Sequence, residues 1–211
     1  MRRRLPLLLV VVAVAVSACG DPAPGGGVTV QFVGNSTCDT SGQSAYSPSP
    51  PNTNANPVGQ AINEMPHIHV APPTRITYEH NPPTSGCHYS LGNGVAPIKS
   101  GVYPASSATT LTAEYWVHNL EHGYIVVTYN CPSGCDSDLN ALNTWYKALP
   151  PDPGGVGYAK FIAVPYPQQK ERWDVLSWDW FDPVGSTLNL TEIQKFYDNH
   201  VNQSPEGATA G

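Results

Sequence analysis

The chain has 211 residues and a formal net charge of −6, from 16 acidic and 10 basic side chains. This acidic balance disfavours nucleic acid and anionic lipid headgroups as partners, because both would repel an acidic surface. The 22 prolines and 19 glycines predict many loops, while the length is sufficient to bury a sizeable core in one domain.

The N-terminus has the pattern of a secretory signal peptide: a basic start at residues 2–4 and an apolar run over Leu5–Val16. The next residues, up to Cys19, match the lipobox of bacterial lipoproteins. The apolar run is shorter than the about 20 residues that a membrane-spanning helix requires. We therefore expect a signal peptide over residues 1–18 and a lipid on Cys19. The mature chain would lie in the cell envelope, outside the cytosol, and touch the membrane only through that lipid.

Composition divides the remaining chain into three parts. Residues 19–57 are rich in Gly, Pro, Ser and Asn, which is typical of a flexible tether or linker. Residues 58–203 carry the periodic apolar patterns and are expected to form one globular domain. Residues 204–211 are expected to be a flexible tail.

Four cysteines remain after Cys19. An even number of cysteines outside the cytosol favours disulfide bonds. Of the three possible pairings we expect Cys38–Cys87 with Cys131–Cys135, although the sequence by itself leaves the pairing open.

The chain up to residue 130 predicts strands. Gly123–Asn130 is the strongest, because it is dense in β-branched and aromatic residues. Shorter strands are expected over Val28–Val33, Arg75–Glu79 and Ala113–His118.

The chain after residue 130 predicts helices separated by strands. Apolar residues of 136–149 fall on one helical face, with Asp136 as the expected N-cap. Strands are expected over 161–166 and 173–181, and a final helix starts near Glu192 with Thr191 and Gln194 as a capping box. This order predicts a single α+β domain in which a small mixed sheet packs against two helices. A thioredoxin-like arrangement is one version of that class.

Histidines form the main chemical signal, because six of the seven lie between positions 67 and 122. His67 and His69 would share a face of a strand. His118, Glu121 and His122 have the spacing of one helical turn, and His88 follows a rigid proline-rich turn. Since neutral imidazole is the commonest transition-metal ligand, these spacings indicate a metal site. His200 instead lies on the apolar face of the last helix and is expected in the core, and His80 neighbours the turn.

The motifs resemble those of a bacterial domain-of-unknown-function family, number 3105. The resemblance covers about residues 65–203 and rests mainly on the turn Asn81–Gly86 (NPPTSG) before His88 and on the run His118–Gly123 (HNLEHG). Tyr78, Gly101 with Tyr103, and Glu114 agree with it. It implies an exported or membrane-tethered protein and assigns no activity.

The resemblance also implies a polar centre, made of His69 or His67 with the histidines and glutamate of the two motifs. The chain departs from the family pattern at Cys87, where proline is commoner, and at Cys131 and Cys135. These departures fit an added disulfide pair or a feature special to this member of the family.

The combined prediction is a transition-metal ion, copper preferred and zinc second, bound by a histidine cluster. The expected ligands are His69, His88, His118 and His122, with His67 as a substitute and Glu121 as a ligand or as a partner that orients an imidazole. No protein partner is predicted.

Three alternatives remain open. The strand followed by Cys131 and Cys135 resembles thioredoxin-like copper chaperones and thiol oxidoreductases. The spacing His118-x-x-Glu121-His122 is that of zinc peptidases with glutamate as general base, but we expect a turn between strands there rather than the long helix that this chemistry needs. A non-catalytic structural or interaction module is the third. Whether the chain is an enzyme is therefore left undecided.

Overall fold

The computed structural model describes residues 56–92, 94–152 and 157–207. The predicted signal peptide, the lipid on Cys19, the strand over Val28–Val33 and nearly all of the tether lie outside these residues. The predicted Cys38–Cys87 bond also does, because Cys38 is not among them. Within the described part, every helix is too short or too polar to cross a membrane.

A mixed sheet of six strands forms the centre of the domain, in the order β1-β8-β7-β5-β6-β4. The pairs β5–β6 and β6–β4 are parallel, and the other neighbours are antiparallel. A second, two-stranded parallel sheet pairs β2 with β3. In chain order the strands are β1 (Gln60–Ala61), β2 (His69–Val70), β3 (His88–Tyr89), β4 (Gly101–Val102), β5 (Ile125–Tyr129), β6 (Phe161–Pro165), β7 (Trp173–Ser177) and β8 (Trp180–Gly185).

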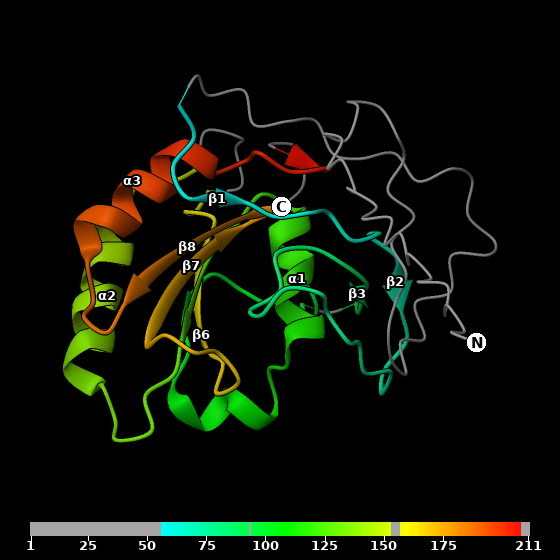
Figure 1. Cartoon of the computed structure of the whole chain (residues 1–211), viewed down its shortest axis with the longest axis horizontal. Helices are drawn as coiled ribbons and strands as arrows, with labels where there is room; N and C mark the ends of the chain where they lie inside the picture. Colours follow the sequence, from blue (N-terminus) through cyan, green and yellow to red (C-terminus); the bar gives the residue numbers. More distant parts are fainter. Residues whose placement is uncertain (1–55, 93, 153–156, 208–211) are drawn as a thin grey trace, which may run out of the picture. The chain divides into compact units, whose positions relative to one another are not determined.

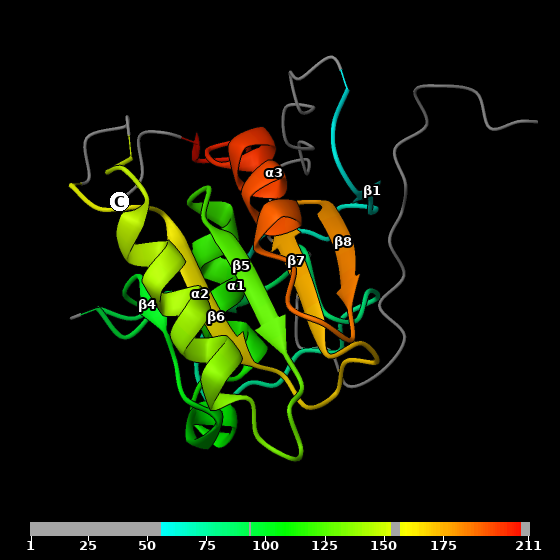
Figure 2. The same cartoon turned by 90° about the vertical axis from the view of Figure 1, so that its left-hand side faces the viewer.

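Helices cover both faces of the central sheet (Figures 1 and 2). Helices α2 (Asp136–Ala148) and α3 (Leu190–His200) pack on one face, and α1 (Ala113–Glu121) packs on the other. A short 3-10 helix, η1 (Ala105–Thr109), precedes α1. Side chains of β5 alternate between the two cores, so all five of its residues are buried. The α+β prediction is confirmed, with three α-helices instead of two in the described part of the chain.

Two predicted strands are wrong. Ala113–His118 is helical, because Trp116, Val117 and Leu120 of α1 together form a buried side against the sheet. Its aromatic and β-branched residues had favoured a strand, but tertiary packing overrides that weak preference. Arg75–Glu79 forms no strand either; the amide of Ile76 donates to the Glu114 carboxylate instead of to a neighbouring strand.

The later helices and β6 agree with the prediction except at their ends, but the strand predicted over 173–181 is divided into two strands. The segment 173–181 contains a hairpin, with β7 and β8 joined at Asp179, whose φ is 61°. The N-cap of α2 is Cys135, and Asp136 is the first helical residue.

The capping residues of α3 also lie earlier than expected. Asn189 and Glu192 cap the helix, not Thr191 and Gln194. The Asn189 side chain accepts from the Glu192 amide at 3.2 Å and donates to the Glu192 carboxylate at 3.0 Å. The helix therefore begins two residues before the predicted start.

The predicted Cys131–Cys135 disulfide is present, in the connection between β5 and α2. Helix α2 connects the parallel strands β5 and β6. The thioredoxin-like version of the fold stays a prediction.

The burial of His200 predicts how the stability of the fold depends on pH. It is buried, it packs on Trp180 and Phe196, and its Nε2 donates to the carbonyl of Val58 at 2.7 Å. Burial lowers its pKa from 6.5 to about 4. Below pH 6.5 the unfolded chain therefore takes up a proton that the folded chain excludes. Stability should fall between these two pH values by up to about 3 kcal/mol from this residue.

Urea unfolding at neutral pH and near pH 4 measures this loss. His200→Gln keeps a donor for Val58 but does not titrate, so its stability should decline less over the same interval. Equal declines in the variant and the natural protein would contradict the prediction.

Candidate metal centre

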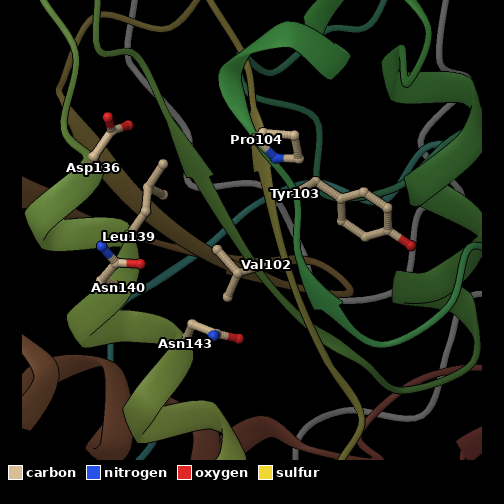
Figure 3. A pocket seen from close by; sticks show the side chains of 7 residues that line it. All are labelled: Val102, Tyr103, Pro104, Asp136, Leu139, Asn140 and Asn143. Atoms are coloured by element: carbon tan, nitrogen blue, oxygen red, sulfur yellow. The ribbon is translucent and has the colours of Figure 1, made fainter.

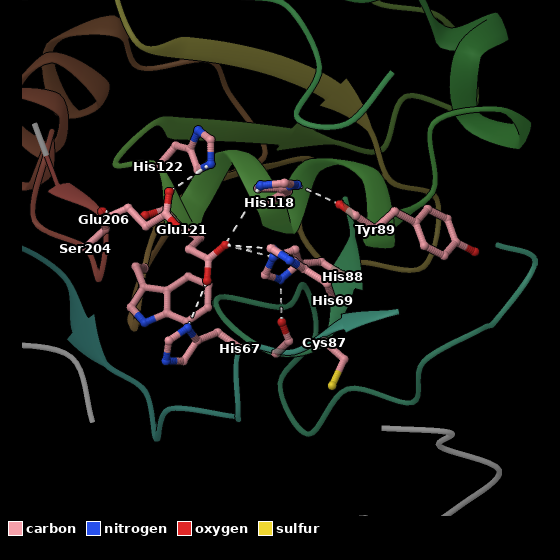
Figure 4. Close-up of polar contacts among 12 residues, drawn as sticks. His67, His69, Cys87, His88, Tyr89, His118, Glu121, His122, Ser204 and Glu206 are labelled. Carbon is pink, nitrogen blue, oxygen red and sulfur yellow. Dashed lines mark hydrogen bonds and ion pairs between the residues drawn. The ribbon is translucent and has the colours of Figure 1, made fainter. Parts of the chain in front are cut away.

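The carboxylate of Glu121, at the end of α1, is surrounded by imidazoles (Figure 4). The Nε2 atoms of His88, His69 and His118 lie 2.9, 3.5 and 3.9 Å from Oε2, and His67 Nδ1 lies 2.9 Å from Oε1. One ligand atom from each of four residues lies within 4.8 Å of the others, and this set could hold a metal ion: His69, His88, His118 and Glu121. We call this set the histidine cluster.

The small sheet supplies two of the imidazoles. Strands β2 and β3 pair in parallel with His69 opposite His88, so both side chains leave the same face. The turn before His88 fixes the second strand. Gly86 in this turn has a φ of +127°, and a Cβ there would lie 3.0 Å from the Tyr78 ring. Glycine is thus required at the last position of the NPPTSG motif.

Helix α1 supplies the third imidazole and the carboxylate. His118 and Glu121 are one turn apart, as their spacing predicted, but on a nine-residue helix and not on a turn between strands. Asn119 anchors the helix because its amide exchanges two hydrogen bonds with the backbone of Ile98. That role of Asn119 was not predicted, since no spacing in the sequence connects the two residues.

The two buried imidazoles are oriented by backbone carbonyls. The Nδ1 atom of His88 lies 2.8 Å from the carbonyl of Gly86, and that of His118 lies 2.6 Å from the carbonyl of Tyr89. A carbonyl only accepts, so each Nδ1 carries the proton and donates. In a neutral ring the lone pair is then on Nε2, the atom that faces Glu121. This arrangement is typical of histidines that bind metal ions.

Burial and hydrogen bonding shift the pKa values in opposite directions. Burial alone would raise the pKa of Glu121, but hydrogen bonds from His67, His69 and His88 hold it well below its usual range. The same contact with Glu121 raises the pKa of His67 and of His69 above 6.5. Burial lowers the pKa of His118 to about 4, so this ring is neutral near pH 7. The cluster therefore contains an ionised carboxylate beside a neutral imidazole.

One side of the cluster is open to solvent. The side chain of His69 is 51% exposed, while those of His88 and His118 are almost fully buried. His67 is half-buried and lies edge-on to Trp178, with ring centroids 5.8 Å apart. An ion would therefore reach the buried donors from the side of His69.

Other predicted residues lie outside the cluster. His122 turns its Nε2 toward Glu206, at 3.1 Å, so it does not complete the predicted set of four imidazoles. Glu206 was missed by the sequence analysis, because residues 204–207 were expected to belong to a flexible tail. The sulfur of Met65 accepts from the amide of Glu79.

His80 and His200 contact backbone carbonyls and aromatic rings elsewhere, and His200 is buried as expected for a core residue. The Cys131–Cys135 disulfide lies beyond the far end of β5. Five strand residues span about 17 Å, so these sulfur atoms cannot share an ion with the histidines.

A pocket of about 370 Å³ lies elsewhere, between β4 and α2 (Figure 3). It contains one carboxylate, from Asp136, and two amides, from Asn140 and Asn143. It shares no residue with the histidine cluster and contains no imidazole. The chemistry suited to a transition metal is therefore found at the cluster and not in this pocket.

These features define a class of protein: an α+β domain with a buried histidine and carboxylate group that could hold a metal ion. The chain belongs to the family described as "Protein of unknown function (DUF3105)", which matches residues 69–211. The family resemblance drawn from the sequence is thus confirmed. No curated protein and no solved structure matches the chain.

The electrostatics of the cluster can be tested in metal-free protein by NMR titration of the histidine rings. Glu121→Gln removes the carboxylate charge, so the pKa values of His67 and His69 should fall toward 6.5, the value from which Glu121 raises them. The pKa of His200 should stay near 4 and thereby report an intact fold. Unchanged values for His67 and His69 would show that Glu121 does not govern them.

Proposed function

We propose that this domain binds a transition-metal ion at the histidine cluster, with copper preferred and zinc second. The observation that carries the proposal is the orientation of His88 and His118. Each donates its Nδ1 proton to a backbone carbonyl, and each turns Nε2 toward the same carboxylate. Protein groups thereby fix two lone pairs and a negative charge around one point.

The hydrogen-bonding needs of His88 support an ion at this point. Both of its nitrogens face oxygen atoms that accept, the Gly86 carbonyl and Glu121. A neutral imidazole has one proton and satisfies only one of them. A cation bound between Nε2 and the carboxylate satisfies the second contact without a proton. The donors present therefore fit a metal ion.

The type of donor supports a divalent ion. Three imidazole nitrogens and one carboxylate oxygen suit copper, zinc, iron or nickel, whereas monovalent copper prefers thiolate and thioether sulfur. The only thioether near the motifs, that of Met65, is occupied by the Glu79 amide. Among divalent ions, copper binds such sites more tightly than zinc, which is the reason for preferring copper.

The proposal includes the cellular location of the domain. We infer an extracytoplasmic lipoprotein from the lipobox at Cys19 and the signal-peptide pattern before it. An acidic chain anchored by the lipid on Cys19 would present the domain, with the exposed His69 ring, to the medium outside the membrane.

Binding is favoured over hydrolysis by the position of Glu121. In the zinc peptidases that share this spacing, the glutamate acts as a base on water while both histidines bind the ion. Here the Glu121 carboxylate contacts four imidazoles, and His122 faces Glu206 instead of the cluster. Glu121 thus has the position of a ligand.

Ligand substitutions test the proposal. His88→Ala and His118→Ala each remove one fixed lone pair. Loss of a residue that only orients a ligand costs about 10–100-fold in affinity, so Cu²⁺ binding should weaken by more than about 100-fold. Isothermal titration of protein purified without an affinity tag measures the affinity, and elemental analysis counts the ions.

Two further variants keep this test decisive. His69→Ala removes a half-exposed ligand and leaves the core intact, so weaker binding there cannot be attributed to unfolding. His80→Ala removes an imidazole outside the cluster and should bind like the natural protein. Unaltered affinity in the three cluster variants would refute the proposal.

The cysteine pair distinguishes this function from a copper chaperone that uses thiols. Because β5 separates the disulfide from the cluster, the double variant Cys131→Ser with Cys135→Ser should keep its full copper content. Its stability should fall, since this short covalent loop contributes about 2 kcal/mol. A loss of copper without unfolding would instead support the chaperone.

A further inference from the structure

A second group of metal-binding side chains lies directly beside the histidine cluster. Ligand atoms of Glu121, His122 and Glu206 lie within 4.8 Å of one another. Glu121 belongs to both groups. In Figure 4, His122 and Glu206 lie on one side of the Glu121 side chain, and His69 and His88 lie on the other.

The chain holds Glu206 in this position through its backbone. The Ser204 hydroxyl donates to the carbonyl of Glu121 at 2.7 Å, and the Glu206 amide lies 3.3 Å from the same oxygen. Lys160 Nζ donates to the carbonyls of His122 and Gly207. These contacts tie the end of α1 to both sides of Glu206.

The segment that carries Glu206 can lie at the end of α1 because its backbone passes very close to that of Gly123. Gly123 has a φ of +81°, and a Cβ there would lie 2.7 Å from the Cα of Asn202. Only glycine at position 123 allows Asn202 to pack against the end of α1. There the Asn202 amide donates to the Gly123 carbonyl. The glycine of the HNLEHG motif therefore serves the segment that carries Glu206.

This group joins two carboxylates to one imidazole. Two carboxylates that lie within 4.8 Å repel each other when both are ionised, and a bound cation would relieve that repulsion. His122 turns its Nε2 atom toward Glu206, at 3.1 Å, so a ring nitrogen that can bind an ion faces the same group.

We propose that Glu121, His122 and Glu206 bind a second divalent transition-metal ion, so that the Glu121 carboxylate bridges two ions. This inference rests on the proposed function of the histidine cluster. A carboxylate has two oxygen atoms and can serve two ions, and ions in two-metal sites are about 3.5–4 Å apart. Glu206 is the ligand specific to the second position, and His88 and His118 are specific to the first.

The test uses the full chain and Cu²⁺ alone. Native mass spectrometry counts bound ions, and electron paramagnetic resonance measures whether their spins are coupled. The natural protein should bind two ions, with a signal smaller than that of two isolated Cu²⁺ ions because the bridged spins interact. Glu206→Gln should bind one ion with the full signal of an isolated spin. Glu171→Gln, which changes a partly exposed carboxylate elsewhere, should behave like the natural protein.

Every other outcome contradicts either the two-metal centre or metal binding as a whole. A single ion in the natural protein, whether or not Glu206→Gln removes it, overturns the two-metal centre and leaves metal binding intact. Two uncoupled ions in the natural protein would place the second ion elsewhere. Two ions retained in Glu206→Gln would do the same, and either result overturns the two-metal centre. Absence of any bound ion overturns the proposed function together with this inference.

Discussion

A buried carboxylate is stable in its ionised form only when donors or cations surround it, and Glu121 obtains both from histidines. Within the described residues, the imidazoles of His67, His69, His88 and His118 lie around it, and each forms an ion pair with it only when the ring is protonated. An arginine or lysine would hold the charge permanently, but imidazole can give up its proton near neutral pH. The same residues can thus stabilise Glu121 with protons or present lone pairs to an ion.

The fold brings these residues together through three independent local structures. Parallel pairing of β2 with β3 sets His69 beside His88, the glycine-ended turn aims the His88 ring, and the last turn of α1 supplies His118 and Glu121. Each structure is held by contacts outside the cluster, such as the amide pair of Asn119 with Ile98. The geometry of the donors therefore does not depend on the donors themselves, which is the condition for a preorganised site.

Sequence spacing could identify the donors of the cluster because they come in short motifs. His118 and Glu121 are close enough in the chain for local geometry to place them together, and His69 and His88 each belong to, or follow, a short motif of their own. Ala113–His118 was assigned wrongly because its composition favours a strand, while its helical form depends on packing against the sheet. Glu206 could not be found, since its approach to His122 depends on the folded positions of Gly123, Lys160 and Ser204.

The position of the cluster also bears on whether an ion would serve folding or activity. In small metal-dependent domains the ion replaces a hydrophobic core, and removal of the ion unfolds the chain. Here two cores on opposite faces of the sheet are built from aromatic and aliphatic side chains, and none of the cluster residues belongs to either core. The cluster lies at the end of α1, with His69 open to solvent. Since these cores supply apolar burial on both faces of the sheet, an ion is not needed in place of a hydrophobic core, and a bound ion would serve activity and not folding.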